Sequence, residues 1–160
     1  MKKIMKEFIN IVLFEPEIPA NTGNIGRLCV GLDIKLHLIE PLGFKLTARE
    51  IKRAGMDYWG DLNLERYSSL DDFFMKTKSN TVDSVNFYFA STKAQRSYLD
   101  IKYKKGDYII FGKESAGLPN VFHTFYKERG ISIPMSGKIR SINLSNSCAI
   151  IAYEALRQLR

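Results

Sequence analysis

The chain has few of the residues from which metal sites and disulfides are built. It contains two cysteines and two histidines among 160 residues. Cys29 and Cys148 have no further cysteine or histidine at zinc-ligand spacing, and we interpret both as core thiols of a reducing compartment. His37 and His123 have no partner at metal spacing either, so we expect both to be structural or surface histidines. The sequence therefore predicts neither a bound metal nor a disulfide.

Long apolar runs are missing as well. Residues 1–19 begin with basic side chains, but Glu7 and Glu15 interrupt the apolar stretch and no small-residue cleavage site follows. No stretch has the length of a membrane span, and we expect a cytoplasmic protein with no membrane partner. A nucleophile elbow and a Walker loop are also absent from the sequence, which gives hydrolysis and phosphoryl transfer little support.

Positive charge is what the chain has in excess. Its 24 Lys and Arg against 17 Asp and Glu give a formal net charge of +7. This balance favours a polyanionic partner such as nucleic acid, although a need for solubility explains it equally well. The length of 160 residues and the apolar content of 45% predict one folded domain covering residues 1–160.

Apolar runs of strand length alternate with helical patterns along the chain. The predicted strands cover residues 8–14, 35–39, 62–67, 86–90, 108–111 and 131–133, and the predicted helices cover residues 21–32, 47–55, 70–78, 120–129 and 143–160. Such alternation predicts an α/β domain with a largely parallel sheet. We expect ligands beyond the carboxyl ends of its strands, where the unusual loops of this chain lie.

The loop before the last helix is crowded with polar groups. Serines at 136, 141, 145 and 147 and asparagines at 143 and 146 surround Lys138 and Arg140. A helix start needs only one or two such side chains, so this loop is predicted to be a binding surface. The helix that follows carries a second apolar set outside its main stripe, namely Ile150, Tyr153 and Leu156, which predicts burial on two sides.

Residues 21–26 match two of the three glycines of a dinucleotide-binding turn. Glu40 ends the next predicted strand, where that fold keeps its ribose-binding acid. A phosphate site at a helix N-terminus and a plain helix cap account for this stretch equally well, and an NAD site accounts for it less well.

Arg27 is predicted to lie in the first turn of that helix, where the dipole disfavours a cation. Either an anionic ligand or a salt bridge to Glu15, Glu17 or Glu114 would compensate. Gly112 and Gly117 flank Glu114 in the loop after residue 111.

We interpret that loop either as a glycine-bearing turn or as a place where backbone meets ligand. In the second case Gly112→Val should weaken ligand binding while the fold survives.

Three stretches, taken in order, resemble one family. Residues 15–29, 111–119 and 133–146 are similar to the SPOUT superfamily of RNA 2′-O-methyltransferases. Within it they resemble the small bacterial enzymes that methylate the ribose of the wobble nucleotide, position 34, of tRNA. Residues 39–41 and 53–58 extend the likeness, which covers almost the whole chain.

The resemblance implies a parallel α/β sheet with a C-terminal trefoil knot, and a homodimer whose active sites draw on both subunits. It implies that Arg27 is catalytic and that the basic face of the domain holds a tRNA anticodon stem-loop. S-adenosylmethionine is expected in a pocket formed by Ala90, Gly112, Ile133, Ser141 and Ile142. Substrate-binding roles are assigned to Asn21, Glu114, Arg140 and Asn143. The alternatives are a non-catalytic nucleotide- or RNA-binding module and an NAD-dependent enzyme.

Overall fold

The protein folds around a six-stranded sheet in which every neighbouring pair of strands is parallel. The computed structural model describes residues 7–79 and 86–160. The strands are β1 (Ile9–Phe14), β2 (Lys35–Ile39), β3 (Leu64–Tyr67), β4 (Phe87–Ala90), β5 (Asp107–Phe111) and β6 (Gly130–Ile131). Their order across the sheet is β3-β2-β1-β5-β4-β6. The predicted α/β architecture is confirmed.

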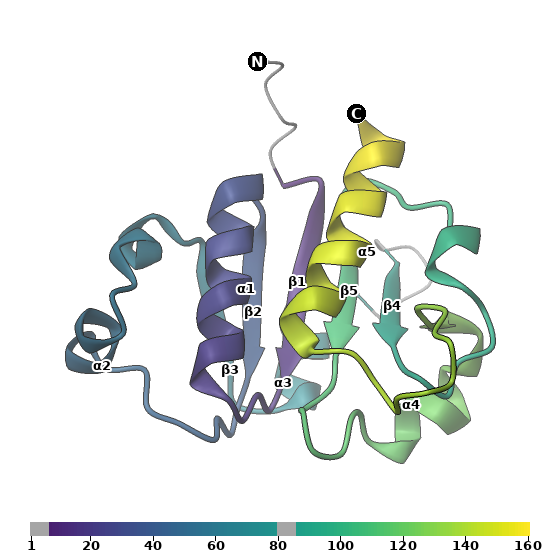
Figure 1. Cartoon of the computed structure of the whole chain (residues 1–160), viewed down its shortest axis with the longest axis horizontal. Helices are drawn as coiled ribbons and strands as arrows, with labels where there is room; N and C mark the ends of the chain where they lie inside the picture. The colour runs from purple at the N-terminus through teal and green to yellow at the C-terminus, as the bar shows by residue number, and fades with distance from the viewer. Residues whose placement is uncertain (1–6, 80–85) are drawn as a thin grey trace.

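Helices cover both faces of this sheet. They are α1 (Pro19–Leu32), α2 (Ala48–Arg53), α3 (Leu70–Thr77), α4 (Asn120–Phe125) and α5 (Leu144–Leu159), with 3-10 helices η1 (Asp57–Asp61), η2 (Tyr98–Asp100) and η3 (Lys127–Arg129). Helices α1 and α5 lie side by side on one face, while α2 and η1 project beyond the β3 edge (Figure 1).

Several boundaries differ from the predicted ones. Helix α1 begins at Pro19, before residue 21, because a proline at the first helical position has no N–H to leave unsatisfied. Strand β6 ends at Ile131, since Ser132 leaves β4 and pairs with residues 96–98 instead. Helix α4 ends at Phe125, and a 3-10 turn replaces its predicted last residues.

The alternation of side chains along β1 divides the interior into two cores. Ile9, Ile11 and Leu13 face the layer of α1 and α5. Val12 and Phe14 face the opposite layer, which α3 and α4 cover. Because both faces of the central strand are buried, its sequence reads as an apolar run that only Asn10 interrupts.

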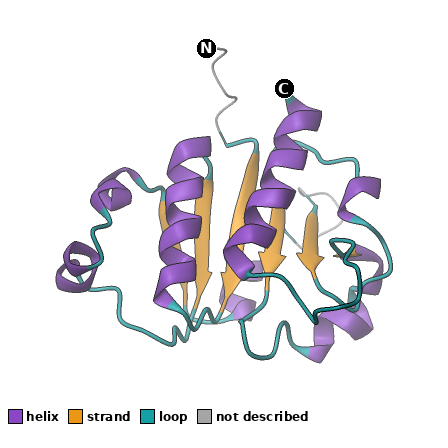
Figure 2. Ribbon diagram, viewed as in Figure 1, coloured by secondary structure: helices purple, strands orange, loops and turns teal. Residues whose placement is uncertain are grey.

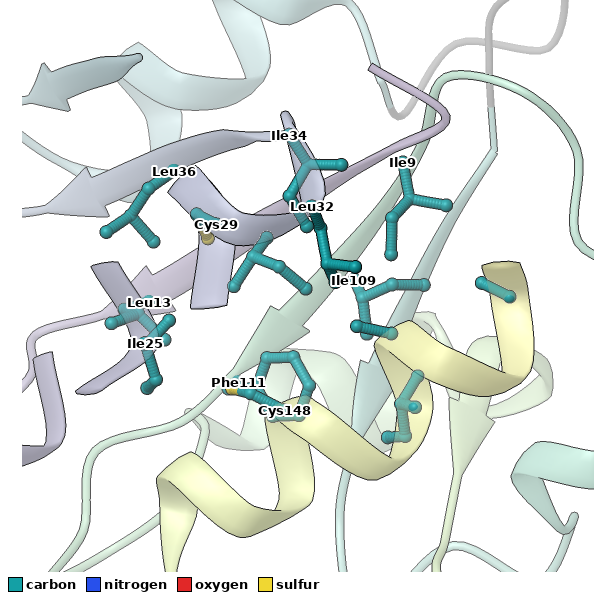
Figure 3. Packing of buried hydrophobic residues seen from close by; sticks show 14 of the residues in the cluster. Ile9, Leu13, Ile25, Cys29, Leu32, Ile34, Leu36, Ile109, Phe111 and Cys148 are labelled. Atoms are coloured by element: carbon teal, nitrogen blue, oxygen red, sulfur yellow. The ribbon is translucent and has the colours of Figure 1, made fainter. Parts of the chain in front are cut away.

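Both cysteines belong to the first core. Cys29 on α1 and Cys148 on α5 are fully buried among aliphatic side chains and Phe111 (Figure 3). Burial raises the pKa of the Cys29 thiol to about 12, and it raises that of Cys148 as well. Both thiols therefore stay protonated and pack as small apolar groups, which confirms their predicted role.

His37 lies in the second core, where it is 2% exposed. Its Nδ1 lies 2.8 Å from the Tyr67 hydroxyl and its Nε2 lies 3.0 Å from Oδ1 of Asn10. Burial, assisted by the charge of Lys35, lowers the pKa of His37 to about 3. The prediction that His37 is structural is confirmed, because both ring nitrogens already have partners.

This burial predicts a loss of stability in acid. The pKa of His37 is lower in the folded chain than the value of about 6.5 for an unfolded chain. Its contribution is therefore fully present above pH 6.5 and is lost as the pH falls toward 3, by up to about 1.4 kcal/mol per pH unit. Urea unfolding at several pH values between 7 and 4.5 should give a shallower decline for His37→Gln than for the wild type. Equal slopes would contradict the neutral, buried histidine.

Candidate active site

The loops with unusual sequences gather at the carboxyl edge of the sheet. Residues 15–18 follow β1, residues 112–119 follow β5, and residues 132–143 connect β6 to α5. Strands β1 and β5 are neighbours, and the loops lie together beyond the arrowheads (Figure 2). Helices α1 and α5 both begin at this edge (Figure 1). The fold thus brings together the three stretches on which the resemblance rests.

Glu114 fixes the start of α1 from the loop after β5. Its carboxylate accepts hydrogen bonds from the backbone N–H of Glu17 at 2.8 Å and of Ile18 at 3.1 Å. It also accepts one from Nδ2 of Asn21 at 3.1 Å. Ile18, the N-cap, has no side-chain acceptor of its own, so Glu114 supplies the negative group that a helix N-terminus favours.

Asn21 also forms a hydrogen bond with Asn143 at the start of α5. Its Oδ1 accepts a hydrogen bond of 3.0 Å from Nδ2 of Asn143. Asn143 in turn caps α5, because its Oδ1 accepts from the backbone N–H of Ser145 at 2.8 Å and of Asn146 at 3.2 Å. We call this set of bonds the Glu114–Asn21–Asn143 network. The predicted start of the last helix at residue 143 is confirmed.

Two further contacts fasten the first loop to the second. Nζ of Lys113 lies 3.0 Å from Oε2 of Glu15. Ser115 donates from both its backbone N–H and its hydroxyl to the Glu17 carboxylate, each at 2.8 Å. These donors, the backbone N–H first, lower the pKa of Glu17. Sequence reasoning missed the Ser115–Glu17 contact, since it joins residues 98 apart in the chain.

Gly112 is required by its own loop. A Cβ atom at this position would lie 2.3 Å from the carbonyl carbon of Gly117. The loop folds back tightly because the Gly117 N–H donates to the Lys113 carbonyl at 2.8 Å, with Gly117 at a φ of +68°. The expectation that Gly112→Val spares the fold is therefore wrong, because valine would collide with the backbone.

The residues proposed for the cofactor lie at this edge, at different depths. Ala90, Gly112 and Ile133 stand at or just beyond the carboxyl ends of β4, β5 and β6, which are adjacent in the sheet. Ala90 and Ile133 are half-buried against the first core. Ser141 is exposed and Ile142 half-buried in the loop before α5. Half-buried apolar side chains beside backbone groups suit a purine ring and its polar edge, so these residues fit the cofactor.

Arg140 lies exposed in that same loop. Asn21, Glu114 and Asn143, the other predicted substrate-binding residues, are brought together but bond to one another. Their contact with a substrate stays a prediction.

Arg27 is not in the first turn of α1. Since α1 starts at Pro19, Arg27 lies in its third turn, beyond the reach of the positive dipole end. The acids offered as its partners are engaged elsewhere, as described above. The exposed guanidinium lies over the ring of Tyr58, with its Cζ 5.8 Å from the ring centroid. Sequence reasoning missed this contact, although residues 53–58 formed part of the resemblance.

Gly23 and Gly26 serve packing and lie inside α1. A Cβ at Gly23 would lie 3.3 Å from the sulfur of Met56, and one at Gly26 would lie 3.1 Å from the Trp59 ring. The absence of side chains at Gly23 and Gly26 thus allows η1 to pack closely against α1. The predicted phosphate-binding turn is wrong, because both glycines lie inside the helix and face Met56 and Trp59. Glu40, the ribose-binding acid of the NAD hypothesis, forms a 2.6 Å salt bridge with Arg66.

Two hollows lie elsewhere on the surface. One of about 470 Å³ lies between α2 and η1, and another of about 500 Å³ lies between α3 and α4. Within residues 7–79 and 86–160, no helix is long and apolar enough to cross a membrane. The same residues contain no cluster of three or more His, Cys, Asp or Glu suited to a metal ion.

Comparison with known proteins identifies the family. The model of the SpoU rRNA Methylase family matches residues 8–153. The chain belongs to this family. A relative from Listeria monocytogenes is 49% identical to this SpoU methylase over 152 residues, covering 93% of this chain and 87% of its own. A relative from Photorhabdus asymbiotica, named tRNA (cytidine(34)-2′-O)-methyltransferase, is 44% identical over 153 residues and covers 94% of both chains.

Solved structures agree with the fold. A crystal structure from Bacillus anthracis superposes with a TM-score of 0.88 at 40% identity, covering 94% of this chain and 93% of the other. A structure described as giving insights into the 2-OH methylation of C/U34 on tRNA superposes with a TM-score of 0.84 at 38% identity, covering 94% and 95%. AviRb from Streptomyces viridochromogenes, in complex with AdoMet, shares the fold at 21% identity, with a TM-score of 0.78 and coverage of 98% and 59%.

The network predicts that Glu114 stabilises the folded chain. Glu114→Ala would leave two backbone N–H groups and the Asn21 amide without their acceptor, and we expect the free energy of unfolding to fall by about 2 kcal/mol. Urea unfolding beside Glu128→Ala, which removes an exposed acid of η3, measures the difference. Equal stability of the two variants would contradict the network.

Proposed function

We propose that this SpoU methylase transfers a methyl group from S-adenosylmethionine to the ribose 2′-hydroxyl of tRNA wobble nucleotide 34. The observation that carries the proposal is the Glu114–Asn21–Asn143 network, which gathers the three loops of the resemblance at one edge of the sheet. The Photorhabdus relative and the structure concerned with C/U34 support the choice of nucleotide. The cell compartment is the cytoplasm, where tRNA is found.

The cofactor binds at the carboxyl ends of β4, β5 and β6. Ala90 and Ile133 contribute apolar walls there, Gly112 contributes backbone, and Ser141 and Ile142 close the site from the last loop. When bound, S-adenosylmethionine supplies an electrophilic methyl group on a sulfonium and leaves as a thioether. The task of the protein is to hold the 2′-oxygen in line with that methyl, since alignment removes much of the barrier.

Arg27 positions the RNA. Its guanidinium is exposed, and we assign it a binding role and not that of a base. Its fork of N–H donors binds the phosphate next to the reacting ribose and orients the hydroxyl. The proton of the hydroxyl passes to a phosphate oxygen as the new O–C bond forms.

The substrate is the anticodon stem-loop of a tRNA. The net charge of +7 and the exposed Lys138 and Arg140 beside the cofactor loops suit a phosphate backbone. Asn21, Glu114 and Asn143 act on the substrate through the shape that they give these loops. The family name mentions rRNA, so an rRNA fragment belongs in the same assay as tRNA.

The active unit is a homodimer. Tyr153, on the side of α5 turned away from the core, is 56% exposed, and Ile150 and Leu156 are only half-buried. A two-fold interface would cover this apolar set and bring residues of both subunits to each site.

The chain is also knotted at its C-terminal end. Support for this comes from Ser132, whose N–H donates to the Arg96 carbonyl while its own carbonyl accepts from Tyr98. After this contact with the preceding loop, the chain returns across the sheet to pack α5 on α1. A crystallographic backbone trace tests the knot.

The catalytic role predicts a selective loss in the Arg27→Ala variant. Methyl transfer should fall about a hundredfold, the usual effect of losing one charged contact in a transition state. The affinity for S-adenosylmethionine should stay unchanged, and Arg27→Lys should restore little. Mass spectrometry of nucleosides from tRNA and rRNA fragments, after single-turnover incubation, measures both product and rate.

Arg66→Ala, which removes a guanidinium at the β3 edge, is the matched control and should keep the wild-type rate. A wild-type rate in Arg27→Ala would contradict the role of Arg27. Methylation of the rRNA fragment alone would contradict the tRNA assignment.

The dimer predicts a specific sensitivity at Tyr153. Tyr153→Asp would place a charge in the apolar interface and should give a monomer with little methyl transfer. Glu128→Ala should leave assembly intact. Light scattering at micromolar concentration, with the methylation assay on the same samples, gives the answer. An active monomer would show that assembly is not needed.

A further inference from the structure

We propose that Tyr58 is a positioning residue for Arg27, holding the guanidinium in the orientation that methyl transfer needs. This inference rests on the proposed function of Arg27. It starts from the contact between the two side chains, in which the guanidinium carbon lies 5.8 Å from the centre of the Tyr58 ring. That distance is within the range of a cation–π attraction, which is electrostatic and favours the charged group over the face of the ring.

The hydroxyl of Tyr58 also bonds to α1, one turn before Arg27. It donates a 2.5 Å hydrogen bond to the carbonyl of Gly23. In an α-helix the carbonyl of residue 23 also receives the N–H of residue 27. Tyr58 therefore acts on Arg27 in two ways. Its ring contacts the Arg27 guanidinium, and its hydroxyl bonds to the Gly23 carbonyl, which also receives the Arg27 backbone N–H.

The packing of η1 leaves the ring little freedom to move. Met56 and Trp59 lie against the places where Gly23 and Gly26 have no side chain, so η1 approaches α1 closely on either side of Tyr58. Burial raises the pKa of the Tyr58 hydroxyl, which keeps it a donor to Gly23.

The direction of the side chain then connects this contact with the site. Helical side chains lean toward the N-terminus of their helix, and α1 begins at the edge where Glu114 and Asn21 lie. The Tyr58 hydroxyl bonds to Gly23, which is one turn nearer the N-terminus of α1 than Arg27. A guanidinium that lies over the Tyr58 ring is thus held toward the N-terminal end of α1. A free arginine at the same position would sample several rotamers, few of them productive.

Variants of Tyr58 and of a second tyrosine, Tyr126, separate positioning from packing. Tyr58→Phe keeps the ring and should keep kcat within about twofold. Tyr58→Leu removes the ring and should lower kcat about tenfold or more with KM for tRNA almost unchanged, because a misplaced group loses alignment rather than affinity. Tyr126→Leu, the same change in a ring that packs on Phe87 and Phe122 in the second core, should lower the Tm and leave kcat of the folded protein near the wild-type value.

A double-mutant cycle gives a second reading. In the Arg27→Ala background, Tyr58→Leu should cause no further fall in the single-turnover rate, since it acts through Arg27. A fall by the same factor in both backgrounds, or an equal loss of kcat in Tyr126→Leu, would overturn the proposal.

A spectroscopic reading does not depend on activity. The Nε–H resonance of Arg27, assigned by its absence in Arg27→Ala, should be shifted by the aromatic ring in the wild type and in Tyr58→Phe. It should return to the position of a free arginine in Tyr58→Leu and stay shifted in Tyr126→Leu. An unshifted wild-type resonance would overturn the proposal. A shifted resonance together with full methyl transfer by Arg27→Ala would instead overturn the proposed role of Arg27.

Discussion

The carboxylate of Glu114 at the start of α1 is the interaction on which the arrangement of the site depends. It accepts hydrogen bonds from the backbone N–H groups of Glu17 and Ile18, just before the first helical residue, and it places a negative charge where the helix favours one. Through Asn21 and Asn143 the same carboxylate is connected to the cap of α5. Two helices and three loops thus share one set of hydrogen bonds, so the shape of each loop depends on the others.

Helix α1 serves two further purposes along its length. One side buries Ile25, Cys29 and Leu32 in the first core. Another side has glycines at 23 and 26, which admit η1 and bring Tyr58 beneath Arg27. The pattern that suggests a phosphate-binding turn is therefore a helix–helix packing pattern. Glycine allows close approach both to a phosphate group and to another helix, so the same sequence pattern suits either partner.

The sequence predicted the elements and the loops better than the contacts between them. Residues 8–14 read correctly as a central strand because an apolar run is a local signal. The predicted start of α1 was two residues too late, because a proline such as Pro19 suits both a loop and a first helical position. As a result, Arg27 was predicted in the wrong turn of the helix. The bond between Asn21 and Glu114 joins residues 93 apart in the chain, so local patterns could not supply it. The family resemblance identified both residues as candidates, but it did not predict that they bond to each other.

Hydrogen–deuterium exchange, with and without S-adenosylmethionine, tests most directly whether the carboxyl edge is the active site. We predict slower exchange on addition of the cofactor in residues 90–98, 112–118 and 132–143, and unchanged exchange in residues 48–60, which include the lining of the hollow between α2 and η1. Slower exchange confined to residues 48–60, or to residues 70–78 and 121–126 around the hollow between α3 and α4, would contradict the account.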